Sequence, residues 1–531
     1  MPTLEWTGKD KVINHHQEVP YRVLERQYTY LGHGQTGEEI PDGNKIIHGD
    51  NLEALKALLP QYEGRIKCIY IDPPYNTGNE NWVYNDNVND PKIKKWLGQV
   101  VGKEGEDLSR HDKWLCMMYP RLKLLQRLLA SDGVIFVSID EIEHRYLELI
   151  MDEIFGANNR IDTFVWQNNY GGGAKSNYIV HLHEYVICFA KNIKTVGKIE
   201  LPPDENILKY YKYKDDRYEL RGPYRLQPLA TTSMDERPNL RYPLYYDGCE
   251  IWPEKQWFWS KERALEAQAN DELVFSQRNG KWSVNYKQYL KGIDGKERKS
   301  KPYSIITGIY TQAGTKAIKN IMGNGKAFDF PKPPQLIMHF IQMVTSPNDI
   351  ILDSFAGSGT TAHAVLNMNK ADGGHRKFIL VEMMDYAETI TAERVRRVID
   401  GYGEGKNATE GTCGSFSYYE LGQPLMHADH TLNEDVPTEK IRQYVYFMET
   451  KQPMGQANQG EPYLLGRHKN AAYYFYYEKE QATILNHNFL ATVQTKAENY
   501  VIYADLCTLS EEELQGAHIT FKKIPRDISK L

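Results

Sequence analysis

Three observations predict an α/β protein whose single sheet is built from two separated pieces of the chain. Strand-like and helix-like segments alternate from Lys45 until the pattern breaks at Asn168, which is typical of a parallel sheet with helices on both faces. The alternation is absent over residues 192–330 and resumes at Pro331. The middle segment is therefore interpreted as a domain inserted into the sheet domain.

The elements of the first piece carry clear local signals. Residues 66–71 form a continuous apolar run with β-branched residues, as expected of a buried strand. Residues 51–62 place four leucines on one helical face. The other expected elements are a strand at 45–50, helices at 113–130 and 141–155, and strands at 131–140 and 183–191.

The second piece repeats the alternation. Residues 333–345 predict a helix with proline in its first turn. The elements expected after it are a strand at 349–355, a loop and helix at 357–369, a strand at 376–382 and a helix at 386–399.

This pattern divides the chain into five segments. Residues 1–43 are polar and irregular and are expected to form an N-terminal arm. Residues 44–191 and 331–420 are the two pieces of the sheet domain, and residues 192–330 are the insertion. Residues 421–531 are expected to form a small C-terminal α/β domain, with strand-like runs at 471–478, 499–506 and 518–524.

Composition narrows the class of protein. The 531 residues are enough for two to four domains, and 41% hydrophobic with 25% charged residues is typical of soluble proteins. No apolar stretch is long enough to cross a bilayer, and the N-terminus lacks the apolar core of a signal peptide, so a cytoplasmic protein is expected. The six cysteines form no CxxC pair, which argues against a disulfide framework or a zinc site.

Charge is distributed unevenly along the chain. The net charge is −6, yet residues 191–330 hold 25 Lys and Arg against 18 Asp and Glu. The excess of positive charge in the middle segment would be useful against phosphates.

The tetrapeptide Asp72-Pro73-Pro74-Tyr75 directly follows the expected buried strand at 66–71. Ligands of open α/β sheets bind at the carboxyl ends of strands. The prolines fix the backbone and lack N–H donors, which leaves the Pro73 carbonyl to accept. That carbonyl and the Asp72 carboxylate can accept both hydrogens of an –NH2 group, while the Tyr75 ring can stack on a planar base. The tetrapeptide predicts a receptor for an aromatic amine.

A second motif, DSFAGSGTT at 353–361, lies between an expected strand and an expected helix. Gly357 and Gly359 allow a ligand to approach the backbone closely, and a helix N-terminus offers free N–H groups to an anion. Ser358, Thr360 and Thr361 can hold a small carboxylate. Glu382 ends the next strand, where an acidic residue would accept hydrogen bonds from ribose hydroxyls.

Together these motifs resemble those of S-adenosylmethionine-dependent amino-methyltransferases. The order, DPPY before FAGSG with an insertion between them, resembles the β class of DNA methyltransferases. The strings at 48–51 (HGDN) and 332–337 (KPPQLI) resemble further elements of that class. The string DPPYNTG, the strand at 183–191 and the segment GSFSYYELG look like the Mod subunits of type III restriction–modification systems. The resemblance covers residues 44–192 and 331–420.

The resemblance implies a Rossmann-like methyltransferase sheet, an inserted target-recognition domain, and transfer of a methyl group to adenine N6 in duplex DNA after base flipping. Asp72 and the Pro73 carbonyl would accept from the amine as it attacks the methyl group, and no metal is required. Asp50 would bond the adenine of the cofactor, and Lys332 would pack under its methionine end. The implied catalytic residues are Asp72, Pro73, Pro74 and Tyr75, and the implied cofactor-binding residues are Asp50, Asp72, Lys332, Asp353, Phe355, Ala356, Gly357, Ser358, Gly359, Thr360, Thr361 and Glu382.

The implied partners are double-stranded DNA, a second copy of the chain and a helicase–nuclease restriction subunit, with no membrane. Three alternatives stay open. The first is transfer to cytosine N4, although the resembling families favour serine in place of Asp72 for cytosine. The second is methylation of RNA or of protein glutamine, against which the large basic and aromatic insertion argues. The third is a non-catalytic DNA-reading subunit, against which the intact Asp72, Tyr75, Gly357 and Glu382 argue.

Overall fold

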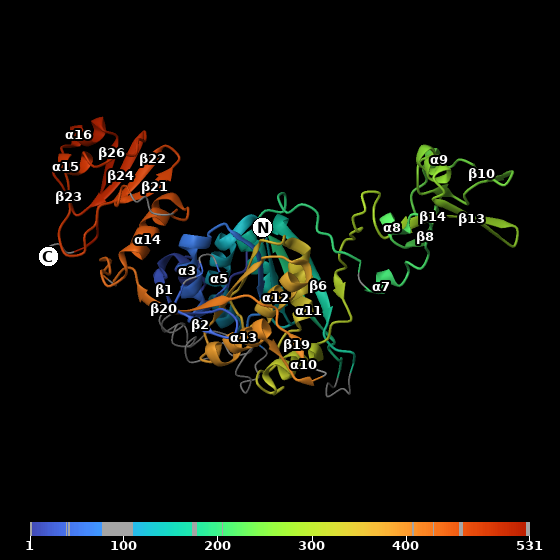
Figure 1. Cartoon of the computed structure of the whole chain (residues 1–531), viewed down its shortest axis with the longest axis horizontal. Coiled ribbons are helices and arrows are strands. Elements are labelled where there is room, and N and C mark those ends of the chain that lie inside the picture. The colour runs from blue at the N-terminus through green and yellow to red at the C-terminus, as the bar shows by residue number, and fades with distance from the viewer. Residues whose placement is uncertain are drawn as a thin grey trace. The chain divides into compact units, whose positions relative to one another are not determined.

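The computed structural model describes residues 3–38, 40, 43–76, 110–171, 178–203, 205–405, 408–427, 429–455 and 460–526. The chain divides into two compact units, one made of residues 1–198 with 303–531 and the other of residues 199–302 (Figure 1).

The larger unit is organised around an eleven-stranded sheet in the order β15-β6-β7-β5-β4-β16-β17-β3-β20-β1-β2. The six strands from β5 to β20 in that order run parallel, whereas β7 is antiparallel to both β5 and β6, and β1 is antiparallel to β20. The sheet is therefore mixed rather than purely parallel. The strands are β1 (Arg22–Tyr30), β2 (Gln35–Thr36), β3 (Lys45–His48), β4 (Ile66–Ile71), β5 (Leu129–Ile139), β6 (Arg160–Gln167), β7 (His183–Ala190), β15 (Ile305–Ile306), β16 (Ile350–Asp353), β17 (Lys377–Glu382) and β20 (Phe416–Pro424).

Helices cover both faces of this sheet, and the alternation of strand residues explains how. Ile69 and Ile71 of β4 belong to the core that α3, α5 and α6 share. The residue between them, Tyr70, faces the opposite side, where its ring stacks on Phe340 of α11 at 6.1 Å between centroids. The helices are α1 (Lys9–Val12), α2 (His15–Glu18), α3 (Asn51–Tyr62), α5 (Arg110–Leu128), α6 (His144–Phe155), α10 (Thr311–Met322), α11 (Pro334–Val344), α12 (Thr360–Asp372), the π-helix η4 (Ala387–Ala392) and α13 (Glu393–Asp400).

The expected alternation in two pieces of chain, with helices on both faces, is confirmed. Strand β6 is a further element that the sequence analysis did not identify. Among the described residues, no helix combines the length and the apolar character that a membrane span needs.

The expectation of an irregular N-terminal arm is wrong for the part of residues 1–43 that forms α1, α2, β1 and β2. Strand β1 pairs with β20 and extends the sheet, and Tyr28 stacks on Tyr418 at 5.3 Å. The strand is rich in polar residues and has solvent on part of its surface, so its sequence shows no clean apolar alternation. Its stability comes from a partner almost 400 positions away in the chain.

The insertion is shorter than the expected range 192–330. Strand β15 pairs in parallel with β6, and α10 contacts α13, so residues 303–330 belong to the larger unit. Residues 199–302 hold 19 Lys and Arg against 17 Asp and Glu. The excess positive charge of the middle segment therefore lies mostly outside the compact insertion.

The smaller unit has a core of its own, formed around the buried Trp257, whose indole N–H donates to the carbonyl of Tyr242 at 2.8 Å. Its main sheet has the order β13-β14-β8, and two strand pairs, β10-β11 and β12-β9, accompany it. Its elements are α7 (Glu205–Leu208), α8 (Tyr218–Arg221), β8 (Tyr224–Pro228), β9 (Ala230–Thr231), η3 (Pro238–Leu240), β10 (Leu244–Tyr246), β11 (Cys249–Ile251), β12 (Gln256–Trp257), α9 (Lys261–Ala269), β13 (Leu273–Arg278) and β14 (Lys281–Tyr289).

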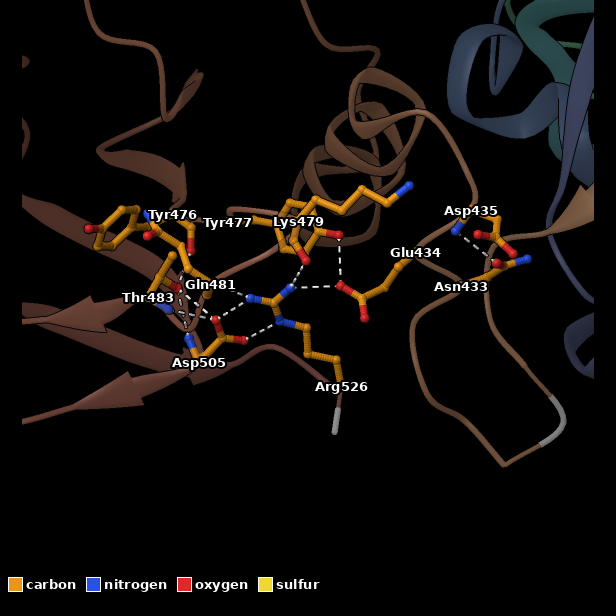
Figure 2. A network of polar contacts seen from close by, with 10 residues as sticks. All are labelled: Asn433, Glu434, Asp435, Tyr476, Tyr477, Lys479, Gln481, Thr483, Asp505 and Arg526. Atoms are coloured by element: carbon orange, nitrogen blue, oxygen red, sulfur yellow. Dashed lines mark hydrogen bonds and ion pairs between the residues drawn. The ribbon is translucent and has the colours of Figure 1, made fainter. Parts of the chain in front are cut away.

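The C-terminal part folds around a four-stranded sheet in the order β21-β22-β24-β26, which confirms the three expected strands. Strand β20 runs through Pro424, so the central sheet ends a few residues beyond the expected boundary at 421. At the last described residue, the Arg526 guanidinium is buried against Asp505 and Glu434 (Figure 2). The elements are α14 (Thr438–Thr450), β21 (Leu464–His468), β22 (Ala471–Phe475), β23 (Ile484–Leu485), α15 (His487–Leu490), β24 (Asn499–Ala504), β25 (Leu506–Cys507), α16 (Glu511–Gly516) and β26 (Ile519–Lys523).

Candidate functional site

One edge of the sheet collects acidic side chains, because the parallel strands all end there. Strands β4 and β16 are neighbours, and the chain leaves β4 toward β5 but leaves β16 toward β17. Connections that diverge in this way open a crevice at the carboxyl ends of the two strands, where open α/β sheets bind ligands. Five parallel strands, β3, β4, β5, β16 and β17, have an acidic residue at or just after their carboxyl ends. In the same order these residues are Asp50, Asp72, Asp140, Asp353 and Glu382.

Asp72 stands directly after β4 in a cluster of four interacting side chains. The Lys332 ammonium lies 3.1 Å from Asp72 Oδ1 and 3.2 Å from Glu184 Oε2. The same ammonium donates to the hydroxyl of Tyr75 at 2.7 Å, and that hydroxyl donates to Glu184 Oε2 at 3.0 Å. Two carboxylates, one ammonium and one phenol thus share a mostly buried space.

Burial sets the charge state of this cluster. It raises the pKa of Asp72, and the nearby Glu184 carboxylate acts in the same direction, while the Lys332 ammonium opposes both. Burial alone would lower the pKa of Lys332, but Asp72 and Glu184 hold it above its ordinary value, so the ammonium stays charged. Burial and the two carboxylates raise the pKa of Tyr75 well above its ordinary value, so its hydroxyl stays neutral.

The two prolines of the tetrapeptide have different partners. The indole N–H of Trp114 donates to the Pro74 carbonyl at 2.6 Å, which anchors the turn to α5. Among the described residues, none donates a hydrogen bond to the Pro73 carbonyl. Thr77 and Gly78, the last two residues of the string DPPYNTG, lie outside the described residues.

The glycine-containing loop after β16 is held by two carboxylates. Asp353 accepts from the backbone N–H of Phe355 at 3.0 Å and from the Thr361 hydroxyl at 2.5 Å. Glu382 at the end of β17 accepts from the backbone N–H of Gly357 at 2.8 Å. Burial raises the pKa of both carboxyl groups, Asp353 and Glu382, to about 7. The loop of the motif is therefore shaped by the acidic side chains that flank it.

Gly359 precedes α12 in the left-handed conformation, with φ of 79°. A Cβ at this position would lie 3.2 Å from the Thr391 carbonyl oxygen. Both observations explain why glycine stands here.

The hydroxyls of Ser358 and Thr360 have a partner that the sequence did not reveal. The fully buried Arg394 guanidinium donates to each of them at 2.7 Å. Burial lowers the pKa of Arg394 to about 9, which leaves it charged at neutral pH. A positive charge thus stands behind the first turn of α12, where an anion would bind.

A narrow cavity of about 30 Å³ joins the two motifs. Asp72, Lys332, Asp353 and the loop residues 355–358 with Thr360 line it, together with Phe328 and Phe330. The structure therefore places Asp72 of the expected amine receptor and the expected cofactor loop against one shared space, whereas Pro73, Pro74 and Tyr75 do not line it. Thr361, Gly359 and Glu382 support this loop rather than line the cavity.

Asp50 has a different position from the other expected residues. Its Oδ1 accepts from the backbone N–H groups of Leu52 and Glu53 and so caps α3. Its Oδ2 lies 3.2 Å from the buried guanidinium of Arg121. Asp50 is at the same sheet edge, but it does not line the cavity.

In the part of the chain that the structure describes, no three His, Cys, Asp or Glu side chains gather as a metal site would require. All six cysteines are free thiols, and three of them, Cys68, Cys116 and Cys188, are buried.

The smaller unit carries an exposed strip of basic and aromatic residues, 208–214. It contains three lysines and three tyrosines and no acidic residue. Lys212 and Lys214 are exposed, as are Tyr210 at 64% and Tyr213 at 48%. Interleaved cations and rings of this kind are suited to a nucleic-acid backbone and its bases.

The fold and the site define an α/β protein with a cavity at the divergence of two parallel strands, where the expected amine-receptor residue Asp72 lies next to a glycine-containing loop. The chain belongs to the DNA methylase family, whose model matches residues 66–393. The resemblance found in the sequence is thereby confirmed at the level of the family.

Three relatives are similar over most of the chain. The Mod subunit of the StyLTI type III restriction–modification enzyme of Salmonella typhimurium is 30% identical over 79% of this chain and 66% of its own length. The EcoPI Mod subunit of Escherichia phage P1 is 32% identical over 72% of this chain and 63% of its own length. The type II methyltransferase M.KpnI of Klebsiella pneumoniae is 33% identical over 64% of this chain and 80% of its own length. The matched region thus spans just under two thirds of the two Mod subunits.

Proposed function

We propose that this protein transfers a methyl group from S-adenosylmethionine to adenine N6 in duplex DNA, as the modification subunit of a type III-like restriction–modification system. One observation carries the proposal: Asp72, from the amine receptor, and residues 355–358, from the glycine loop, line the same cavity. Membership in the DNA methylase family and the similarity to two type III Mod subunits support it.

The residues of the loop fit this cofactor chemically. The N-terminus of the 13-residue helix α12 and the Arg394 charge behind it suit the carboxylate of a methionyl group. Glu382 supplies a carboxylate at the strand end for ribose hydroxyls. The cavity of about 30 Å³ has room for one or two water molecules. Phe328 and Phe330 line it, so we expect these rings to shift when the cofactor binds.

When bound, S-adenosylmethionine supplies an electrophilic methyl group on a sulfonium sulfur. The chain supplies the acceptors for the target amine, namely the Asp72 carboxylate and the Pro73 carbonyl. Because Lys332 contacts Oδ1 of Asp72, the second carboxylate oxygen is the proposed acceptor for the amine. Positioned acceptors orient the nitrogen lone pair and stabilise the positive charge that develops on it. The Tyr75 ring provides the surface on which the flipped base stacks.

The test is single-molecule sequencing of DNA from cells that express the wild type or Asp72→Ala. The wild type should leave N6-methyladenine in one sequence context, and the variant should leave none while still binding S-adenosylmethionine in calorimetry. Asp162→Asn, which removes an exposed carboxylate on β6, is the control and should methylate normally. Methylated cytosine would show the cytosine N4 alternative instead, and unmodified DNA from folded wild type would refute the proposal.

We further propose that the insertion, expected at 192–330 and compact over 199–302, recognises the target sequence. Its two ends are tied by backbone hydrogen bonds in both directions between Leu201 and Ser300, each of 2.8 Å. Residues 202–299 can therefore be replaced by two glycines with little strain on the remaining chain. In the protein that lacks residues 202–299, the larger unit should keep its melting temperature and still bind the cofactor. This protein should lose sequence-specific methylation. Retention of the same methylated sequence would contradict the assignment.

The proposed partners are duplex DNA, a second copy of the chain and a helicase–nuclease restriction subunit, and the proposed location is the cytoplasm. The names of two relatives, which call them Mod subunits of type III enzymes, support the restriction subunit. Light scattering at micromolar concentration, with and without DNA, tests the homodimer. A monomer mass in both conditions would exclude a stable one.

A further inference from the structure

Glu184, the second residue of β7, joins elements that are far apart in the sequence. Its Oε2 accepts from the Tyr75 hydroxyl at 3.0 Å and lies 3.2 Å from the Lys332 ammonium. Its Oε1 accepts from the Asn168 amide at 2.9 Å. The side chain is only 17% exposed, so these contacts replace most of its hydration. One carboxylate thus connects β7, the end of β6, the tetrapeptide loop and the segment before α11.

The first consequence concerns the ring of Tyr75. Its hydroxyl donates to Glu184 and accepts from Lys332, which fixes the far end of the ring. The Lys332 ammonium lies 4.7 Å from the ring centroid, at the hydroxyl end of the ring. These contacts of the hydroxyl therefore fix the plane of the ring on which a base would stack.

The second consequence concerns Lys332 itself. Its ammonium is shared between Asp72 Oδ1 and Glu184 Oε2 at nearly equal distances of 3.1 and 3.2 Å. Without Glu184, the buried ammonium would keep one carboxylate partner and would move closer to Asp72. It would then compete with the target amine for the carboxylate that the amine needs.

We propose that Glu184 is a positioning residue for methyl transfer: it fixes the plane of the Tyr75 ring and draws Lys332 partly away from Asp72, so that Asp72 can accept from the target amine. This inference rests on the proposed function. Glu184 itself contacts none of the loop residues 355–358, and in the proposal it does not contact the substrate.

The experiment compares Glu184→Ala and Glu184→Gln with the wild type and with the control Asp162→Asn. Glu184→Gln keeps oxygen and nitrogen atoms in the place of the carboxylate, whereas Glu184→Ala removes every contact. We expect kcat to fall about 100-fold in Glu184→Ala, since misplacement of about 1 Å can cost that much. Glu184→Gln should recover part of the loss. The Kd for S-adenosylmethionine should stay within about twofold in both, because Glu184 contacts none of the loop residues 355–358.

Two further readouts distinguish positioning from a merely structural role. With 2-aminopurine at the target adenine of a duplex, the fluorescence quenching caused by stacking on Tyr75 should weaken in Glu184→Ala. The pH profile should also change. The titratable groups that face Asp72 are Tyr70, Tyr75, Glu184, Lys332 and Asp353.

Because the Glu184 charge raises the pKa of Asp72, its neutralisation in Glu184→Gln lowers that pKa. Asp72 acts in its ionised form, so the acid limb of kcat/KM should move to lower pH in this variant and stay in place in Asp162→Asn.

A folded Glu184→Ala with wild-type kcat, or a Glu184→Gln with an unmoved acid limb, would overturn the inference. If Glu184→Ala does not fold, Asn168→Ala tests the same contact from the other side and should lower kcat in the same direction; unchanged kcat there would also overturn it. Failure of the proposed function is distinguishable, because then the wild type itself would leave duplex DNA unmethylated.

Discussion

Replacing Arg526 with alanine should destabilise the C-terminal part by several kcal/mol. The Arg526 side chain is 1% exposed, and all of its guanidinium N–H groups donate hydrogen bonds. Two bonds go to Asp505 at 2.8 and 2.7 Å and one to Glu434 at 2.7 Å, and the carbonyls of Lys479 and Gln481 accept one each (Figure 2). Its removal leaves the Asp505 carboxylate, which is fully buried, without an opposite charge. Breaking a buried pair from one side costs about 3–5 kcal/mol.

The assay must report on the unfolding of this region alone. Intrinsic tryptophan fluorescence would not detect it, because residues 421–531 contain no tryptophan. Hydrogen exchange of β22 and β24 fits the purpose. A loss of about 3–5 kcal/mol corresponds to exchange faster by roughly two to four powers of ten. The double variant Arg526→Met with Asp505→Leu should lose much less, since neither charge is then left alone.

The pH dependence provides a second check on this reasoning. Burial alone would raise the pKa of Asp505, but its bonds to Arg526 hold that pKa below its ordinary value. The stabilisation by the pair is therefore present above about pH 4 and lost as pH falls through the pKa of the folded state. In Arg526→Ala the pKa of Asp505 should rise, so the gap to the wild type should narrow in acid. Wild-type exchange rates in the single variant, or a constant gap across pH, would refute the argument.

Three other outcomes are expected. Lys212→Ala with Lys214→Ala should weaken DNA binding about equally for all sequences and reduce the salt slope by about two, measured by binding titrations over a range of salt concentrations. Gly359→Val should lower stability by about 1–2 kcal/mol in thermal melts, because its backbone is left-handed. Burial raises the pKa of Glu382 to about 7, so the folded state binds its proton more tightly than the unfolded state. Stability of the ligand-free protein should thus fall as pH rises from about 4.5 to 7, and Glu382→Gln should flatten that trend.

The sequence predicted those elements whose signals are local. Residues 51–62 and 66–71 formed the expected helix and strand because apolar spacing alone defines their buried faces. Strand β1 was missed because pairing with β20 stabilises it despite its polar residues. Strand β15 was missed because two residues are too few to show a period. The boundary at 330 was wrong because β15 and also the helix α10, which lie before it, belong to the larger unit.

The site divides along the same line. Asp72 and residues 353–361 could be placed together from the sequence, because parallel strands end at one edge of a sheet. Glu184 and Arg394 could not, since their roles come only from tertiary contacts with residues on other elements. Asp50, which the motif around it suggested as a cofactor contact, has a further role that the sequence did not predict, because its carboxylate caps α3.

The position of the insertion along the chain has a consequence for the site. Glu184 lies 15 residues before the compact insertion and Lys332 lies 30 residues after it, yet their side chains meet 3.2 Å apart within the larger unit. Closing the chain over an insertion costs little extra free energy with length, about 0.6 kcal/mol per doubling. The insertion can therefore vary in sequence and size without loss of the sheet, provided that the contact between its two flanks is kept. In the proposal above, the same contact draws Lys332 partly away from Asp72, and the Glu184 carboxylate also fixes the ring of Tyr75 through its hydroxyl. A displacement of either flank would thus act on the residues that we propose receive the target base.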